Sequence, residues 1–351
     1  MPISVDIEKR LGDFQLRIRF DAPDAVHGLL GASGCGKSMT LRCIAGVETP
    51  DRGRIVLNDR VLFDSARGVN LSPQERRVGL LFQNYALFPN MTVEQNLLAS
   101  LRGQNRAEAR AQVTAMLRRF RLEGLEHHRP GQLSGGQQQR AALARILLTK
   151  PEILMLDEPL SALDSYLRWQ TELELADLLD DFAGPTLLVT HSREEVRRLC
   201  RSVTVLSRGR GQGSVPVQEL FEAPETLSAC MLSGCKNFSR AEPAGEGRVR
   251  ALDWGAELTV SSNDPEAAYV AVRAHHLELA DGPGENVIPC TVQRVMEDVF
   301  SVIIMASTPG GEEGRQRLRL ELDKKDWAAV PDKQTIYLRL PPERLMLLRE
   351  G

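Results

Sequence analysis

The sequence predicts an α/β domain with a largely parallel sheet, followed by a smaller all-β domain. Five short apolar segments, separated by helical or polar stretches, occur before residue 210. Such segments are typical of parallel strands that are buried on both faces. After residue 234 the pattern changes to short alternating strands with turn-rich spacers, as in a small barrel. We therefore place the two domains at residues 1–234 and 235–351.

The predicted strands of the first domain end in polar residues. They occupy residues 26–30, 76–83, 152–159, 186–191 and 202–209. Strand signals are absent between residues 84 and 145, where residues 94–103 and 106–122 have helical patterns, so a helical insert is expected. In open parallel sheets, ligands bind beyond the carboxyl ends of the strands, where these polar residues fall. Strands of the second domain are expected at residues 266–279, 287–295, 299–307, 315–323 and 335–348.

The overall composition excludes several classes of protein. The chain has 351 residues, 42% of them hydrophobic, which is enough for two packed cores. A formal net charge of −3 gives no general attraction to nucleic acid. No apolar run reaches 18 residues, and the first 14 residues are too charged for a signal peptide, so we expect a soluble, cytosolic protein. The six cysteines show no CxxC spacing, which argues against disulfides and a zinc site.

A glycine-rich loop joins the first predicted strand of the parallel sheet to a helix. The stretch GASGCGKS matches GxxxxGK[ST], in which backbone N–H groups and a helix N-terminus bind phosphate. In this pattern Lys37 reaches the β- and γ-phosphates and Ser38 binds Mg²⁺. The alternative, a plain strand–turn–helix joint, is disfavoured because strand, loop and helix all agree. The loop residues are Gly31, Ala32, Ser33, Gly34, Cys35, Gly36, Lys37 and Ser38.

Cys35 lies inside this loop. A helix N-terminus favours the thiolate, so we expect a lowered pKa for the Cys35 thiol. Alkylation of Cys35 is then expected to inhibit nucleotide hydrolysis.

Three other predicted strands end in residues suited to phosphoryl transfer. Asp157 can hold Mg²⁺, and Glu158 is a candidate base that orients and deprotonates the attacking water. Paired acids after a strand also serve as helix N-caps, which is the alternative. His191 is a candidate contact to the γ-phosphate, and Gln83 a candidate ligand of Mg²⁺ or of the water. A structural role is the alternative for both.

Six motifs together resemble those of ATP-binding cassette ATPases. GASGCGKS, the Gln of LLFQ, LSGGQ, ILMLDEP, SALD and the His of LLVTHS occur in the family's order within residues 1–234. The resemblance implies a RecA-like core with an antiparallel β-subdomain and a helical subdomain. It further implies a homodimer that holds MgATP between the glycine loop of one subunit and LSGGQ of the other. The signature residues are then Ser134, Gly135, Gly136 and Gln137.

The resemblance assigns three further positions. Phe14 is the expected aromatic partner of adenine, and Asp164 is expected at the dimer seam. Met39 stands where the family usually has a Thr beside the α-phosphate, so altered nucleotide contacts are expected. For the signature itself, adjacent glycines permit close backbone approach, and the following helix offers its N-terminus to a γ-phosphate.

Within the family, the chain resembles importer ATPases. The stretch NYALFPNMTVEQNL is similar to the segment that receives the permease, and the region after residue 234 is similar to the OB-like (TOBE) domain of importers. The resemblance thus implies a peripheral protein at the cytoplasmic face of the membrane, with permease subunits and an extracytoplasmic binding protein as partners. The start KRLGDFQLRIRF favours molybdate; sulfate is close behind, and polyamine, sugar or iron are further alternatives. A cassette protein of DNA repair or translation is the alternative from another class.

Overall fold

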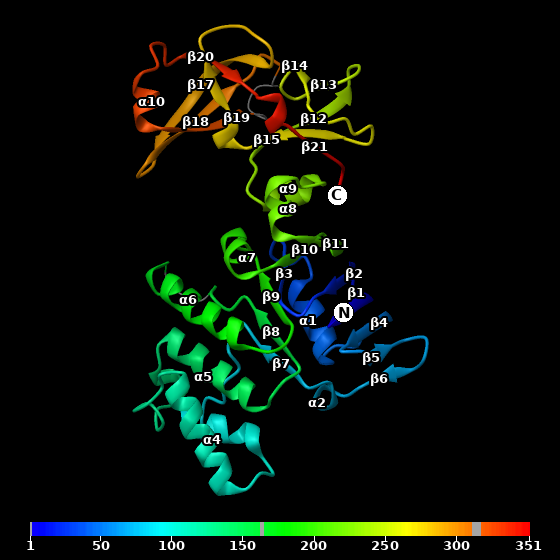
Figure 1. Ribbon diagram of the computed structural model, residues 1–351, viewed down its shortest axis with the longest axis vertical. Coiled ribbons are helices and arrows are strands. Elements are labelled where there is room, and N and C mark those ends of the chain that lie inside the picture. The colour runs from blue at the N-terminus through cyan, green and yellow to red at the C-terminus, as the bar shows by residue number, and fades with distance from the viewer. Residues whose placement is uncertain (1, 162–164, 311–316) are drawn as a thin grey trace. The chain divides into compact units, whose positions relative to one another are not determined.

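The computed structural model describes residues 2–161, 165–310 and 317–351 (Figure 1). It divides into two compact units, Met1–Val217 and Gln218–Gly351. The sequence analysis placed the boundary after residue 234. The structure places it after Val217, so that two short helices belong mainly to the second unit. These helices are α8 (Val217–Glu222) and α9 (Leu227–Leu232).

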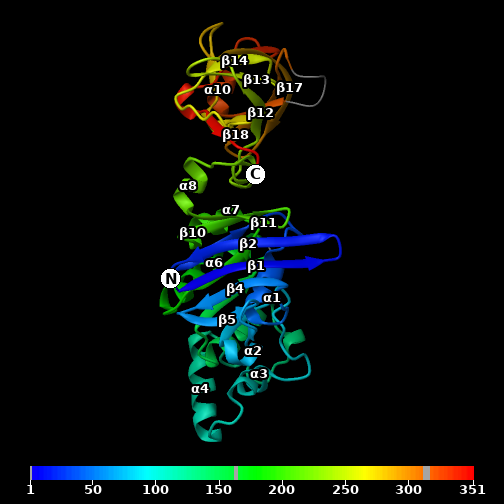
Figure 2. The ribbon, with the colours of Figure 1, turned by 90° about the vertical axis from the view of Figure 1, so that its right-hand side faces the viewer.

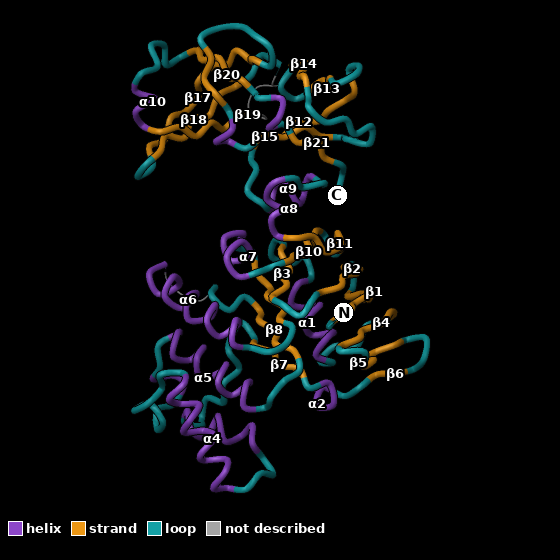
Figure 3. The backbone as a smooth tube through the Cα atoms, viewed as in Figure 1, coloured by secondary structure: helices purple, strands orange, loops and turns teal. Residues whose placement is uncertain are grey.

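One sheet of eleven strands forms the first unit. Its order is β6-β5-β4-β1-β2-β11-β10-β3-β9-β8-β7, and Figure 3 shows it flanked by helices. The five predicted strands are confirmed and pair in parallel with one another. Every residue of β8 and of β9 is buried, which is why their sequences are continuous apolar runs. The five strands are β3 (Val26–Leu30), β7 (Val78–Leu81), β8 (Ile153–Asp157), β9 (Thr186–Thr190) and β10 (Ser202–Ser207).

The rest of this sheet is largely antiparallel, as the family resemblance implied. Figure 2 shows β1, β2, β4 and β5 side by side. In β2 alternate residues are buried, which is typical of a strand with one face on the core. These strands are β1 (Ile3–Leu11), β2 (Phe14–Ala22), β4 (Arg52–Leu57), β5 (Arg60–Asp64), β6 (Val69–Asn70) and β11 (Arg210–Pro216).

The helical insert lies between β7 and β8 in the chain, as predicted. It contains α3 (Val93–Leu98), α4 (Arg106–Arg119) and α5 (Gly135–Leu148), and its apolar side chains join one core with the adjacent strands. The other helices of this unit are α1 (Lys37–Ala45), α2 (Pro73–Arg76), α6 (Ser165–Asp181) and α7 (Arg193–Leu199).

Helix α1 is anchored at its C-terminus by a buried arginine. The guanidinium of Arg76 has no exposed surface, and it donates hydrogen bonds to the carbonyl oxygens of Cys43 (2.7 Å) and Ile44 (2.8 Å). The last carbonyls of a helix have no partner within the helix and carry its negative dipole end. Arg76 therefore satisfies and neutralises this end of α1.

The second unit contains two five-stranded antiparallel sheets, which confirms the all-β prediction. Their orders are β14-β13-β12-β15-β21 and β16-β20-β17-β18-β19, and Trp254 and Trp327 are buried in the shared core. The sequence analysis missed β12–β14 and the short helix α10 (Lys324–Ala328). It also expected single strands at residues 266–279 and 335–348, whereas each range contains two strands that belong to different sheets. The strands are β12 (Asn237–Pro243), β13 (Arg248–Ala251), β14 (Ala256–Thr259), β15 (Tyr269–Val272), β16 (Glu278–Ala280), β17 (Val287–Glu297), β18 (Ser301–Ser307), β19 (Arg317–Asp323), β20 (Thr335–Arg339) and β21 (Met346–Leu348).

No helix among the described residues is long and apolar enough to cross a membrane.

Candidate nucleotide site

Four neighbouring parallel strands bring the predicted site residues to one edge of the sheet. In the register, Leu30 pairs with Thr190, Asp157 with Val189, and Leu81 with Leu156. The glycine loop, the acid pair, His191 and Gln83 all follow these strand ends. The edge is therefore continuous from β3 to β7, as the sequence predicted.

The glycine loop requires glycine at three positions for different reasons. Gly34 and Gly36 have φ of +79° and +111°, which other residues adopt only with strain. A Cβ on Gly31 would lie 2.3 Å from the carbonyl oxygen of Leu206, so no side chain fits there. Helix α1 starts at Lys37 with no side-chain cap and no acidic residue in its first turn. Its N–H groups are thus available to an anion.

Lys37 is folded over this loop. Its Nζ donates to the carbonyl oxygens of Gly31 (2.7 Å) and Ala32 (3.0 Å) and lies 3.8 Å from a carboxylate oxygen of Glu158. The side chain is almost completely buried. The ammonium group of Lys37 therefore connects the glycine loop with Glu158 of the acid pair.

Ser38 and Asp157, both predicted metal ligands, meet directly. The Ser38 hydroxyl donates to Asp157 Oδ1 at 2.8 Å, and burial raises the pKa of the Asp157 carboxyl. A cation beside this carboxylate would offset the desolvation. A hydroxyl and a carboxylate are hard oxygen ligands of the kind that Mg²⁺ prefers, so the residues fit that ion.

Glu158 has an unusual backbone. Its φ is +48°, and its N–H donates to the carbonyl of Val189 at 2.9 Å. Its two carboxylate oxygens lie near Lys37 Nζ and 3.3 Å from His191 Nδ1. A left-handed conformation in a residue other than glycine costs about 1–2 kcal/mol and is often retained at functional sites. This backbone conformation places the Glu158 carboxylate between Lys37 and His191.

The remaining predicted residues of this edge differ in their surroundings. Gln83 is exposed in the turn after β7, two residues beyond the end of the strand. Phe14, at the start of β2, packs close to Gly36, since a Cβ there would lie 3.2 Å from its ring. Met39 is partly buried against the core, and the hydroxyl of Thr40 donates to the carbonyl of Gly36 at 3.1 Å within α1. Asp164 lies outside the described residues.

Cys35 corrects one expectation. The residue is buried, and desolvation raises the pKa of its thiol above the usual value, against the opposing charge of Lys37. The prediction of a lowered thiol pKa at the helix N-terminus was therefore wrong. Because alkylation requires the thiolate, Cys35 is expected to react more slowly than a free cysteine at neutral pH.

The signature residues cap helix α5. Ser134 is the N-cap residue, and its Oγ accepts from the N–H of Gln137 at 3.3 Å, while Gln137 Oε1 accepts from the N–H of Ser134 at 2.8 Å. Gly135 and Gly136 are the first two helical residues. Among the described residues, a Cβ on Gly136 would meet only Thr171 Oγ1, at an ordinary 3.8 Å. The part of the chain that the structure describes thus gives no steric reason for glycine at position 136.

An apolar cavity lies beside the loop after Gln83, in the stretch that resembles the permease-receiving segment of importers. It has a volume of about 410 Å³, and its lining includes the side chains of Val47, Phe82 and Phe88. Buried Asn96 holds the loop through hydrogen bonds with the backbone N–H and carbonyl of Phe88 at 2.8 and 3.1 Å. The Arg145 guanidinium lies 5.2 Å from the centre of the Phe88 ring.

Together these parts define a nucleoside triphosphatase site of the phosphate-loop class, with a separate glycine-rich helix start.

A family model described as "ABC transporter" matches residues 17–161. The molybdenum import ATP-binding protein ModC of Rhodospirillum rubrum is 38% identical, with 97% of this chain and 93% of the relative aligned. The sulfate/thiosulfate import protein CysA of Burkholderia mallei is 36% identical, with 93% and 92% aligned. The spermidine/putrescine import protein PotA of Methylococcus capsulatus is 42% identical, with 66% and 58% aligned.

A solved structure is similar to part of this chain. It is a dimeric ATP-binding cassette in a post-hydrolysis state with ADP and Pi, with a TM-score of 0.52 and 26% identity. The match covers 61% of this chain and 98% of that one. The chain belongs to the family of ABC transporter ATP-binding proteins. It binds ATP and is the ATPase subunit of an ABC importer, coupling ATP hydrolysis to transport.

Proposed function

We propose that this chain powers the import of molybdate or tungstate. The similarity to the Rhodospirillum rubrum molybdenum import protein supports this, because it extends over 97% of the chain and thus over both units. Sulfate or thiosulfate import is the alternative, since the Burkholderia mallei relative matches over nearly the same length. Polyamine import is a further alternative, since a spermidine/putrescine import protein is 36% identical over 94% of the chain, while sugars and iron have less support.

In the proposed cycle, two copies of the chain close over two ATP molecules. Lys37 and the N-terminus of α1 bind the phosphates, and Phe14 stacks on adenine beside Gly36. Ser134 and the backbone of Gly135–Gly136 contact the nucleotide held by the partner copy. The described residues give no steric reason for glycine at position 136, which supports this role.

Ser38, Asp157 and Gln83 are the proposed ligands of Mg²⁺. When bound, this ion would neutralise phosphate charge during transfer. Glu158 orients and deprotonates the attacking water, and His191, 3.3 Å from its carboxylate, positions that base and contacts the γ-phosphate.

The apolar cavity at Phe88 is the proposed binding site for a segment of the permease. A coupling segment docked there would contact the loop that Gln83 begins, so movement at the ATP edge would reach the permease. The chain would then lie at the cytoplasmic face of the membrane, with an extracytoplasmic binding protein as an indirect partner. A nucleic-acid partner is not proposed, in keeping with the net charge of −3.

The test is the ATPase activity of the complex reconstituted with its permease and binding protein, titrated with molybdate, tungstate, sulfate and spermidine. We expect molybdate and tungstate to stimulate turnover at lower concentrations than sulfate. Stimulation by sulfate alone would favour the first alternative, and stimulation only by a polyamine or sugar would refute import of an oxyanion. Activation by DNA or ribosomes without any binding protein would instead support a role in repair or translation.

A further inference from the structure

Glu195 is a buried carboxyl group near the nucleotide edge, and the proposed cycle gives it no role. It lies on α7, directly after the turn at residues 190–192, and only 5% of the residue is exposed. Burial raises the pKa of its carboxyl, so keeping this group in the protein interior costs free energy. Buried polar side chains in native proteins are nearly always hydrogen-bonded, and the partner indicates what the group does.

The partner of Glu195 is Thr190, the last residue of β9. The hydroxyl of Thr190 donates to Glu195 Oε2 at 2.7 Å, and its oxygen accepts from the N–H of Ser192 at 2.9 Å. The N–H of Glu195 donates in turn to Ser192 Oγ at 3.3 Å. These hydrogen bonds close the turn at residues 190–192, and His191 is its middle residue.

This arrangement differs from the usual capping of a helix. Ser192 is the N-cap residue of α7 and Glu195 the third helical residue, which are the positions of a capping box. In such a box the acid accepts the N–H of the N-cap residue directly, as the exposed Glu75 does for Ser72 at 2.9 Å in α2. In α7 the hydroxyl of Thr190 takes that N–H, and the carboxylate of Glu195 is buried against the end of β9. Capping therefore does not explain the burial of this carboxylate.

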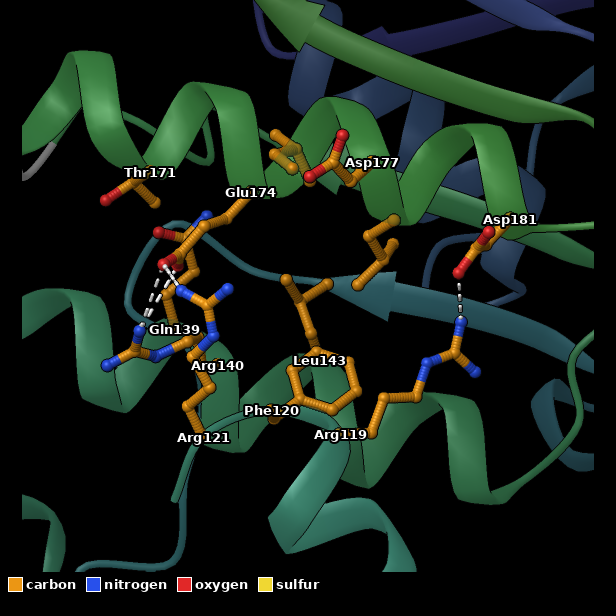
Figure 4. Close-up of a pocket in the computed structure, with 12 residues that line it drawn as sticks. Arg119, Phe120, Arg121, Gln139, Arg140, Leu143, Thr171, Glu174, Asp177 and Asp181 are labelled. Atoms are coloured by element: carbon orange, nitrogen blue, oxygen red, sulfur yellow. Dashed lines mark hydrogen bonds and ion pairs between the residues drawn. The ribbon is translucent and has the colours of Figure 1, made fainter. Parts of the chain in front are cut away.

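The packing of α7 on α6 has an ion pair of its own. Arg198 of α7 donates from two nitrogens to the two carboxylate oxygens of Glu172 on α6, and the bond from Nη2 is 2.8 Å long. A further pair joins α6 to the helical insert, where Asp181 lies 3.0 Å from Arg119 of α4 (Figure 4). Since Arg198 already ties α7 to its neighbour, the contact of Glu195 with Thr190 calls for another explanation.

The turn closed by these hydrogen bonds presents His191 to Glu158. The side chain of His191 is 55% exposed, so its position depends mainly on the backbone of the turn. Its Nδ1 lies 3.3 Å from a carboxylate oxygen of Glu158. Glu158 is fixed separately, because its own N–H donates to the carbonyl of Val189 at 2.9 Å. Loosening the turn would therefore displace the histidine and leave Glu158 in place.

We propose that Glu195 is a positioning residue for ATP hydrolysis. Through the hydroxyl of Thr190, its carboxylate fixes the turn at residues 190–192 and so holds His191 against Glu158. Glu195 acts through these neighbours and need not contact the nucleotide. The inference rests on the role proposed above for His191.

The test is steady-state ATPase kinetics of the complex reconstituted with its permease and binding protein. Glu195→Met keeps the length of the side chain but removes the acceptor oxygens, so kcat should fall by about tenfold as His191 loses its fixed position. KM for ATP should stay unchanged, because Lys37 and the N-terminus of α1 are not altered. Glu195→Gln keeps an oxygen that can accept from Thr190 and should recover most of the lost rate. Glu194→Gln, the same change at the exposed neighbouring residue, should match the wild type.

A double variant distinguishes positioning from a general weakening of the fold. His191→Ala should lower kcat by about 10²-fold. Glu195→Met should cause no further decrease in that background, because the side chain that it positions is already absent. A further decrease of similar size, or a raised KM with an unchanged kcat, would overturn the proposal. A wild-type kcat in Glu195→Met beside a slow His191→Ala would overturn it as well and leave the proposed function standing.

The failure of the proposed function would have a different signature. Normal turnover in His191→Ala would refute the role proposed for His191, and this inference with it. Should Glu195→Met not fold, Thr190→Val breaks the same hydrogen bonds from the other end with a side chain of nearly equal size. It should show the same fall in kcat and the same lack of additivity with His191→Ala.

Discussion

The two glycine-rich stretches of the first unit look alike in sequence but are built in opposite ways. In the loop at residues 31–38, positive φ angles and a 2.3 Å approach to a carbonyl oxygen make glycine a requirement of the fold. In the signature, Gly135 and Gly136 are helical, and the second would accept a side chain without a clash. The comparison teaches that contacts among the described residues account for the glycines of the first stretch but not for Gly136, for which the proposed contact with a partner's nucleotide would be the explanation.

The largest effect on ATP hydrolysis is expected from the variant Glu158→Gln, at the sheet edge beside the glycine loop. Without the carboxylate, the water loses its base, so hydrolysis should fall by about 10³-fold while ATP still binds. ATPase assays and calorimetry with a nonhydrolysable analogue check this. Glu194→Gln, an exposed glutamate on α7, is the control and should hydrolyse ATP normally. Wild-type turnover in Glu158→Gln would exclude this residue as the base.

Alanine at one glycine of each stretch tests the comparison directly. Gly36→Ala imposes a positive φ on alanine and places a Cβ 2.9 Å from Leu16, so it should lower the stability by about 2 kcal/mol and weaken ATP binding. Gly136→Ala should leave the stability unchanged or raise it by up to about 1 kcal/mol, because alanine favours helix.

Thermal denaturation, ATP titration and ATP-dependent dimerisation in size-exclusion chromatography distinguish the two variants. Gly136→Ala should bind ATP as a monomer but dimerise poorly. If it instead lost stability, the contrast drawn here would be wrong.

A charged residue at position 134 distinguishes two roles of Ser134, the capping of α5 and the proposed contact with the partner's nucleotide. Asp caps helices as well as Ser does, so Ser134→Asp should fold and bind ATP normally. Its carboxylate would face the phosphates held by the partner, and we expect ATP-driven dimerisation to weaken by at least about tenfold. Ser134→Arg, with a bulky side chain, should also block closure while sparing ATP binding. Normal dimerisation of both variants would contradict the sandwich arrangement.

The smallest expected effect concerns pH. His27, on β3 directly before the P-loop, is fully buried between Ser202 Oγ and Thr204 Oγ1, and burial lowers its pKa to about 4. Between pH 6.5 and 4 the unfolded chain binds the proton and the native chain does not, so stability is complete above pH 6.5 and decreases as the pH falls. The loss should reach about 1 kcal/mol by pH 5.5.

Hydrogen exchange and thermal denaturation against pH check this, with His27→Gln as the variant that should lack the dependence over this range. The loss should be visible in β3 before the helical insert. An unchanged slope in the variant would assign the pH dependence to other groups.

The sequence predicted the strands and the acid pair because each is encoded locally. A run such as ILMLD is apolar throughout, and a polar residue at its end must fall at the sheet edge. Features that depend on distant contacts were beyond that reasoning. The burial of Cys35 depends on the surrounding core, and β13 and β14 are four-residue strands whose charged side chains weaken the pattern. The left-handed backbone of Glu158 has no local signal, since glutamate has no special preference for that conformation.

The buried guanidinium of Arg76 makes α1 an electrically asymmetric element. Its C-terminal carbonyls already have a cation, whereas its N-terminus has neither a side-chain cap nor an acidic residue in its first turn. An arriving phosphate therefore completes a charge arrangement that Arg76 begins about 13 Å away, at the far end of nine residues. We therefore expect nucleotide affinity to depend in part on Arg76, although it lies at the opposite end of α1 from the glycine loop.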